Sequence, residues 1–146
     1  MVMVRVRGTC VCIDGHAALL RGPSGSGKSD LALRLIDAGG ELVADDYTDV
    51  EQSSDGLVAM APAPIRGLLE VRGLGVIKLG ACSSAPLVAA IDLVPLSDVD
   101  RMPERQWVRI LNARLPCFQL FPFEPSAAAK VRLAVRLATG GIILTK

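Results

Sequence analysis

The residues with the clearest chemical potential form the octapeptide Gly22-Pro23-Ser24-Gly25-Ser26-Gly27-Lys28-Ser29, which fits the phosphate-loop pattern G-x-x-x-x-G-K-[ST]. Its glycines let the backbone close around a phosphate group, so that the amide N–H groups form a nest for an anion. Lys28 adds a mobile positive charge for the β- and γ-phosphates, and the hydroxyl of Ser29 can bind Mg²⁺. We therefore expect all eight residues to bind the phosphates of ATP.

Two adjacent carboxylates, Asp45 and Asp46, follow a short apolar run. This run comes directly after the helix that is expected to follow the loop. In a strand–loop–helix–strand unit this pair reaches the same sheet edge as the loop. Because neighbouring residues of a strand face opposite sides, we expect the two carboxylates to differ in function. One could hold Mg²⁺, and the other could accept a hydroxyl proton. A polar turn is the simpler alternative, since Asp-Asp is common in turns.

A third candidate is the charged pair Glu70 and Arg72, which stands in the apolar segment 70–77 with glycines at 73 and 75. Glycine inside a strand pattern indicates a bend or a close backbone approach. Glu70 could complete a metal shell, and Arg72 could neutralise charge that develops during phosphoryl transfer. An ordinary ion pair at the surface explains the two residues equally well.

The elements that must position these residues are short strands separated by turn signals. Alternating or apolar runs predict strands at 2–7, 9–13, 17–21, 41–44, 57–61, 75–78 and 87–93. Helices are expected at 29–38 and 126–139, the second capped by Ser126 and ended by Gly140-Gly141, with a short helix at 104–111. The octapeptide then lies between a strand and a helix, and the fold class is α/β with a mixed sheet.

Length and composition limit the remaining possibilities. A chain of 146 residues predicts one domain, 1–146. Although 51% of the residues are apolar, no segment approaches the roughly 18 apolar residues of a membrane span. The first seven residues alternate like a strand and lack the separate basic and apolar regions of a signal peptide, so we expect a cytoplasmic protein. A net charge of +1 argues against a nucleic-acid binder.

Cysteines and aromatic residues carry weaker signals. The four cysteines, Cys10, Cys12, Cys82 and Cys117, lack metal-ligand spacing and are expected to be buried free thiols. The aromatic residues of the C-terminal half stand close together between prolines, and they are Trp107, Phe118, Phe121 and Phe123. They predict either core packing under a loop or an interface with another subunit.

The segments GPSGSGKSDLALRL, ELVADD and LLEVRGLGVIKL, in this order, resemble the phosphate loop, double-aspartate strand and signature segment of the bacterial HPr kinase/phosphorylase family. The resemblance covers residues 7–93, and a weaker similarity continues through PFEPSAAAKVRLAV. It implies a phosphate-loop-containing mixed sheet flanked by helices, related to the nucleotide-binding fold of phosphoenolpyruvate carboxykinase. It also implies the family's short form, with the catalytic domain alone.

The resemblance further implies an ATP- and Mg²⁺-dependent kinase that phosphorylates a serine of HPr, the phosphocarrier of the sugar phosphotransferase system. Such an enzyme regulates carbohydrate metabolism, and many members also remove the phosphate by phosphorolysis. Asp45 would be the general base, Lys28 would complete the kinase site, and Arg72 falls in the segment linked to the reverse reaction. The residues around Mg²⁺ would be Ser29, Asp46 and Glu70. The longer members are hexamers, so a homo-oligomer is expected here.

Two departures from the family pattern bear on the reverse reaction. Arg7 occupies the position at which longer members have a catalytic histidine, and His16 lies too close to the loop to replace it. Residues 122–126, PFEPS, stand where longer members carry an arginine-containing loop. Both departures argue against the phosphorylase reaction rather than the kinase reaction. The alternatives are a small-molecule kinase or ATPase with the same loop, and a regulator that senses ATP without turnover.

Overall fold

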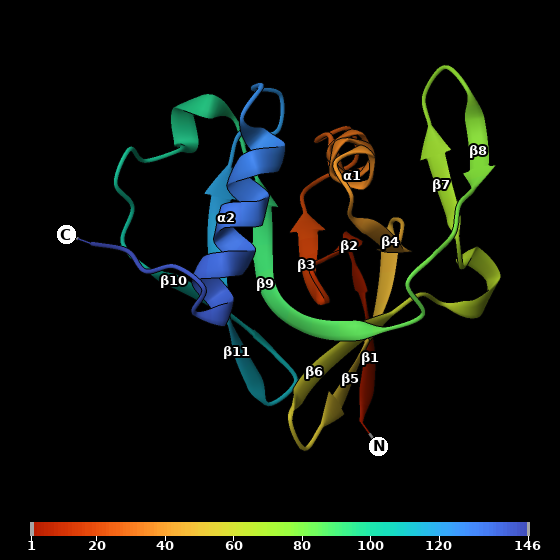
Figure 1. Cartoon of the computed structure of the whole chain (residues 1–146), viewed down its shortest axis with the longest axis horizontal. Coiled ribbons are helices and arrows are strands. Elements are labelled where there is room, and N and C mark those ends of the chain that lie inside the picture. Colours follow the sequence, from red (N-terminus) through yellow and green to blue (C-terminus); the bar gives the residue numbers. More distant parts are fainter. Residues whose placement is uncertain (1, 146) are drawn as a thin grey trace.

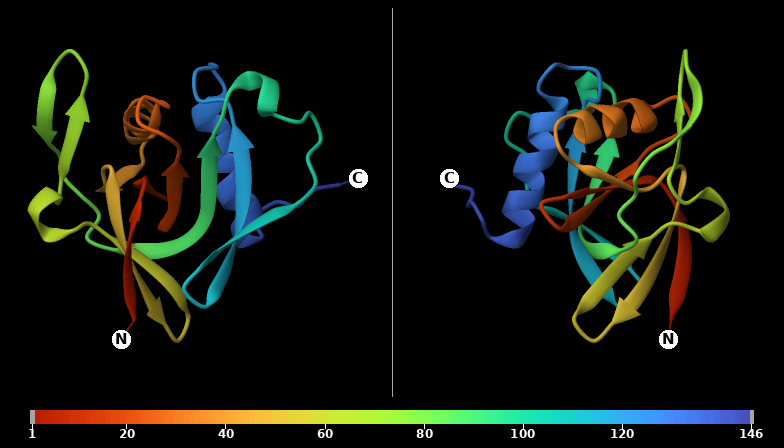
Figure 2. Two further views of the ribbon diagram at one scale, coloured as in Figure 1. Left: turned by 180° about the vertical axis from the view of Figure 1, so that it is seen from behind. Right: turned by 45° about the vertical axis from the view of Figure 1, so that its right-hand side comes forward.

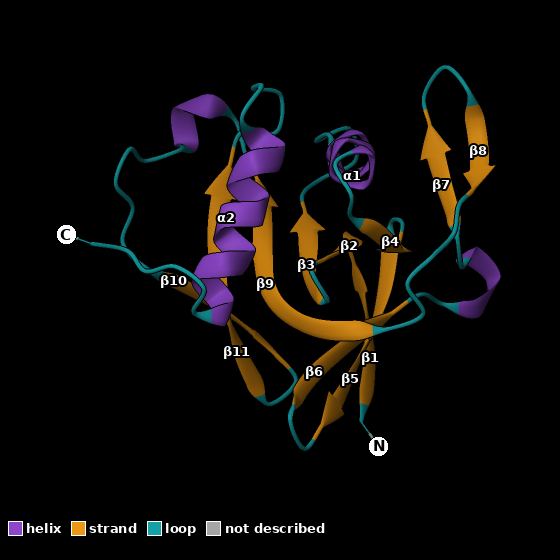
Figure 3. Cartoon of the chain, viewed as in Figure 1, coloured by secondary structure: helices purple, strands orange, loops and turns teal. Residues whose placement is uncertain are grey.

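A computed structural model of the chain describes residues 2–145. Within these residues, nine strands form one mixed sheet that curls on itself, and two helices pack together against one of its faces (Figures 1 and 3). The strand order is β1-β5-β6-β9-β3-β2-β4, with β11 on the other side of β9 and β10 beyond β11. A separate hairpin of β7 and β8 stands beside the sheet. The predicted α/β class with a mixed sheet is confirmed.

The helices are α1 (Lys28–Asp37) and α2 (Ala127–Thr139), and the hairpin is β7 (Leu68–Val71) with β8 (Gly75–Lys78). Two single 3₁₀ turns cover Ala63–Ile65 and Leu96–Asp98. The strands of the large sheet are β1 (Met3–Arg7), β2 (Thr9–Ile13), β3 (His16–Arg21), β4 (Glu41–Ala44), β5 (Tyr47–Ser53), β6 (Gly56–Met60), β9 (Ala85–Leu93), β10 (Gln106–Ile110) and β11 (Ala113–Leu120). No helix among residues 2–145 is long and apolar enough to cross a membrane.

The long strand β9 joins the two halves of the sheet. Its first residues pair antiparallel with β6, at Ala85 opposite Ala59. The chain then curves strongly, as Figure 2 shows, and the rest of β9 lies parallel to both β3 and β11. The carboxyl ends of three parallel strands, β3, β9 and β11, therefore share one edge of the sheet. In doubly wound sheets this edge is where ligands bind.

The central strands are buried on both faces by two separate clusters, and because side chains alternate along each strand, neighbouring residues enter different clusters. On β3, Leu19 packs into a core with strand residues such as Val50, while Leu20 packs into a second core under α1 and α2 with Leu31 and Val131. The same alternation explains the Cys10-x-Cys12 spacing, since both thiols of β2 belong to the first core. A small third cluster, with Leu42 and Leu69, fixes the hairpin beside the sheet.

The expected strands and both long helices are present with ends shifted by two residues at most. The short helix expected at 104–111 is wrong, because Gln106–Ile110 forms strand β10, which pairs with β11 across a tight turn at Leu111 (φ 52°). Ser126 stands at the N-cap of α2, but its side chain makes no capping hydrogen bond. Gly140 ends α2 in the left-handed conformation, as predicted.

Candidate active site

The octapeptide 22–29 connects the end of β3 to the first turn of α1. Gly25 and Gly27 have φ values of 82° and 95°, a region that residues with a Cβ rarely adopt. At Gly22 a Cβ would lie 2.6 Å from the hydroxyl oxygen of Ser26, and at Gly27 it would lie 3.0 Å from the ring of Phe123. Gly25 is thus favoured by its backbone conformation, and Gly27 both by its backbone conformation and by the ring of Phe123 that packs on it.

Two polar groups of this loop support a bound polyphosphate. The Oγ atom of Ser26 is buried and has no hydrogen-bond partner among the described residues. The ammonium of Lys28 donates to the carbonyl oxygens of Gly22, at 2.6 Å, and Pro23, at 3.0 Å. Burial lowers the pKa of Lys28, while the charges of nearby carboxylates act in the opposite direction. Together with the free N–H groups of the first helical turn, these donors fit the phosphates of a nucleotide.

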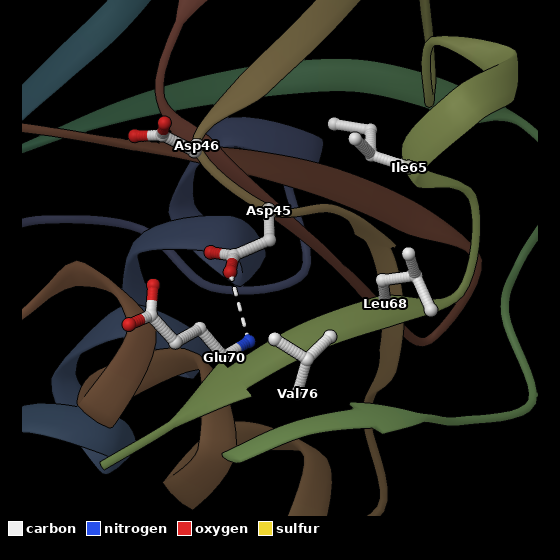
Figure 4. A pocket seen from close by; sticks show the side chains of 6 residues that line it. All are labelled: Asp45, Asp46, Ile65, Leu68, Glu70 and Val76. Carbon is white, nitrogen blue, oxygen red and sulfur yellow. Dashed lines mark hydrogen bonds between the residues drawn. The ribbon is translucent and has the colours of Figure 1, made fainter.

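Asp45 follows β4 and is buried, with three donors on its carboxylate. Oδ1 accepts from the hydroxyls of Ser29, at 2.8 Å, and Thr9, at 3.0 Å. Oδ2 accepts from the backbone N–H of Glu70, at 3.2 Å, a bond drawn in Figure 4. The sequence pattern did not reveal Thr9; the signal that could have revealed it is a lone hydroxyl inside the apolar strand 9–13. These contacts bring the loop, β2, β4 and β7 together at one carboxylate.

Asp46 differs from Asp45 in conformation and surroundings. Its φ of 66° is left-handed, and in Figure 4 its side chain points away from that of Asp45. The carboxylate is 55% exposed and forms an ion pair with Arg7, at 3.4 Å. Its backbone N–H donates to the hydroxyl of Thr9, at 3.2 Å. The expected divergence of the two aspartates is present, but it arises from this left-handed turn after β4 rather than from the alternation of a strand.

The carboxylates border a cavity of about 240 Å³. Asp45, Asp46 and Glu70 supply its polar side, and apolar side chains from the 3₁₀ turn and the hairpin supply the rest (Figure 4). Arg72 does not line this cavity and lies exposed in the turn between β7 and β8. It makes no ion pair with Glu70 among the described residues, so the simple surface pair considered from the sequence is absent.

The expected Mg²⁺ residues are only partly brought together. Ser29 contacts Asp45 rather than Asp46, and Glu70 reaches Asp45 through its backbone. Within residues 2–145 no three His, Cys, Asp or Glu side chains are grouped closely enough to hold a metal ion by themselves. This arrangement fits the usual mode of Mg²⁺, which binds to one or two carboxylates together with substrate phosphates and water.

The fold and these residues define an α/β protein with a candidate phosphate-binding site beside a carboxylate pair. The family model described as HPr Serine kinase C-terminal domain matches residues 2–94, and the chain belongs to this family. The resemblance seen in the sequence is therefore confirmed.

Similar proteins agree with this assignment. The chain is 47% identical over 145 residues to an HPr kinase/phosphorylase of Exiguobacterium sp., covering 91% of this chain and 46% of the relative. It is 40% identical over 123 residues to the HPr kinase/phosphorylase of Geobacillus kaustophilus, and this match covers 76% of this chain and 40% of the relative. The chain thus spans less than half the length of these curated relatives. A solved structure, the Hpr(Ser) kinase/phosphatase from Coxiella burnetii, has the same fold, with a TM-score of 0.83, 23% identity, and coverage of 94% of this chain and 97% of that chain.

Proposed function

We propose that this chain transfers a phosphoryl group from Mg-ATP to a serine of HPr. The observation that carries the proposal is the hydrogen bond between Ser29 and Asp45, because it joins the loop that would hold the phosphates to the carboxylate that would act on the acceptor. The names of the relatives, HPr kinase/phosphorylase, supply the acceptor.

The loop would bind the donor through its N–H groups, through the hydroxyl of Ser26 and through Lys28. For this, Lys28 exchanges its bonds to the loop carbonyls for bonds to phosphate oxygens. Ser29, Asp46 and Glu70 would hold a Mg²⁺ ion, which supplies neutralisation of phosphate charge when it is bound. The loop and its flanking elements thereby fix the position of the reacting phosphate.

Asp45 would accept the proton of the serine hydroxyl. Its three hydrogen bonds hold the carboxylate in one orientation, between the phosphate loop and the cavity in which an acceptor side chain would enter. A positioned carboxylate of this kind is the general base that phosphoryl transfer to a hydroxyl uses. Asp46, paired with Arg7 on the other side, is the less direct candidate.

The direct test mixes the chain with Mg-ATP and HPr from the same cells and maps phosphorylation by mass spectrometry. We expect one phosphoserine, and none with Lys28→Ala, which removes the phosphate-binding charge. Inorganic phosphate is then added. A phosphoserine that persists agrees with the departures at Arg7 and at 122–126, whereas its loss adds phosphorolysis. The proposal fails if HPr stays unmodified while the chain binds Mg-ATP.

A nucleotide-sensing regulator is the alternative, and the Arg7–Asp46 ion pair is the observation that favours it, because an arginine cannot exchange protons as a histidine does. Binding of Mg-ATP without hydrolysis and without phosphoryl transfer to HPr would support this alternative. Assembly as a homo-oligomer, with a hexamer as the family's implication, stays a prediction that light scattering can test.

A further inference from the structure

A second cavity, of about 500 Å³, opens beside the phosphate loop at the shared edge of the three parallel strands. The segment that follows each strand contributes to it. Pro23 and Ser26 follow β3, Leu93 and Pro95 lie at the end of β9, and Phe121 and Phe123 follow β11. Ligands of open α/β sheets bind outside the carboxyl ends of such strands. The place of this cavity in the fold is therefore that of a ligand site.

The cavity is continuous with the phosphate loop. Ser26 belongs to both, and within residues 2–145 its buried hydroxyl has no hydrogen-bond partner. The ring of Phe123 packs directly on Gly27, where a Cβ would lie 3.0 Å from the ring carbons. A ligand whose phosphates lie in the loop can thus extend into this cavity without crossing any other element.

The walls of the cavity are apolar and aromatic. Phe121 and Phe123 meet edge to face, with ring centroids 5.7 Å apart and an interplanar angle of 76°. Phe123 is 59% exposed, so a face of its ring is accessible for stacking. Cavities of 300–1,000 Å³ with apolar walls are typical of small-molecule sites. A flat aromatic group is the ligand that this geometry accommodates, since aromatic rings favour offset or edge-to-face packing.

The wall that carries both phenylalanines is held in place by α1. Arg34 donates to the carbonyl oxygens of Pro122 and of Glu124, the latter at 3.4 Å. Glu124 is in turn paired with Lys130 of α2. The segment 122–124 is thus tied to both helices. Its anchoring on both helices pre-organises the cavity, which reduces the entropy that binding would cost.

We propose that this cavity binds the nucleobase of the phosphoryl donor, with the base stacked on Phe123. The inference rests on the proposed function only in that the donor is a nucleotide; it makes no use of the acceptor. It assigns a binding function to Phe121 and Phe123, two of the four clustered aromatic residues for which the sequence predicted either core packing or an interface.

The test compares the binding of ADP with that of pyrophosphate, both with Mg²⁺, by isothermal titration calorimetry. Phe123→Ala should weaken ADP binding about tenfold, the order expected from the loss of one base–aromatic stack. Pyrophosphate binding should stay within about twofold of the unaltered chain. Trp107→Ala, which removes an exposed aromatic residue of β10 outside the cavity, is the matched control and should change neither affinity.

Phe123→Tyr should restore ADP binding, because the ring is kept, and thermal unfolding of each variant confirms that it is folded. Equal weakening of ADP and pyrophosphate would overturn the proposal, since Phe123 would then act only as a support for Gly27. Unchanged binding of both ligands in Phe123→Ala would also overturn it. None of these measurements requires HPr. The nucleobase proposal and the proposed transfer to HPr can therefore fail independently of each other.

Discussion

Ser29, in the first turn of α1, donates a hydrogen bond of 2.8 Å from Oγ to Oδ1 of Asp45, which follows β4. The two residues are 16 positions apart, and the bond closes the β3–loop–α1–β4 unit at the sheet edge. A shift of the loop 22–29 would therefore also move Asp45, which borders the cavity of about 240 Å³. This coupling gives the two aspartates different expected phenotypes.

Asp45→Asn should keep Mg-ATP affinity and lose phosphoryl transfer by roughly 10²-fold or more, because the amide cannot accept the serine proton. Asp46→Asn should instead weaken Mg-dependent ATP binding, because it removes a carboxylate expected at the ion. Affinity is measured by calorimetry with and without Mg²⁺, and transfer by rapid-quench assays with HPr. The opposite pattern of the two variants would exchange the roles of Asp45 and Asp46.

Thr9→Val should destabilise the fold by about 1–3 kcal/mol, the range for a buried hydrogen-bonding group left unsatisfied. The fully buried Thr9 hydroxyl donates to Asp45 and accepts from the Asp46 N–H, so valine of similar shape leaves both without this partner. Urea unfolding measures the change. Thr9→Ser keeps the hydroxyl and loses only a methyl group, so it is the matched control. Equal stability of the valine and serine variants would contradict the assigned hydrogen bonds.

The place of the loop 22–29 between a strand and a helix was predictable because its requirements are local. Gly25 and Gly27 need left-handed backbone, and an apolar strand before the loop with a helix after it is a short-range pattern. Asp45 and Glu70 were candidates from the residues alone, and the resemblance then implied a role for each. What no local pattern specified is which carboxylate the loop serine contacts, because that depends on the turn at Asp46 and on Thr9 from another strand.

The strands that sequence reasoning missed owe their conformation to tertiary pairing. β5 has the polar sequence YTDVEQS, yet it is held between β1 and β6. β10 was expected as a helix, but Trp107, Val108 and Ile110 favour a strand once β11 provides a partner. Leu111 takes a positive φ in their turn, where glycine or asparagine would have given a clear signal.

Thiol reactivity should distinguish Cys82 from the other cysteines. Burial is the main cause that raises the pKa of Cys12 and of Cys117 to about 11, and the neighbouring Cys82 thiol and Asp92 carboxylate, respectively, add to it. Burial also raises the pKa of Cys10. Because the thiolate is the reactive form, iodoacetamide at pH 8 should label Cys82, which is partly exposed, and leave the other three unlabelled until the chain unfolds. Peptide mapping by mass spectrometry reads the result, and labelling of folded Cys117 at pH 8 would contradict it.

The same raised pKa values predict a loss of stability at alkaline pH. An unfolded chain releases thiol protons near pH 8.5, whereas the folded chain holds those of Cys12 and Cys117 until about pH 11. The unfolded state thus binds fewer protons in this interval, so the free energy of unfolding falls as pH rises from about 8.5 to 11. Cys117→Ala should flatten this fall in urea-unfolding experiments, and an unchanged slope would show that other groups cause it.

Arg7 provides a test of positive charge beside Asp46. Its guanidinium pairs with Asp46 at 3.4 Å and lies 5.4 Å from the ring centroid of Tyr47. Burial is the main cause that lowers the pKa of Lys28, and the positive charge of Arg7 lowers it further by a smaller amount. Arg7→Gln should slow transfer about fivefold to tenfold, because one exposed positive charge near the phosphates is lost.

Arg7→His should restore that charge only below the histidine pKa, which is about 6.5 when unperturbed. Its transfer rate divided by that of the unaltered chain should therefore be near one at pH 5.5 and fall to the ratio of Arg7→Gln at pH 8. Taking the ratio at each pH removes titrations that both chains share, and Arg7→Gln measured over the same range is the uncharged control. A ratio for Arg7→His that does not change with pH would show that the reaction does not use the charge at this position.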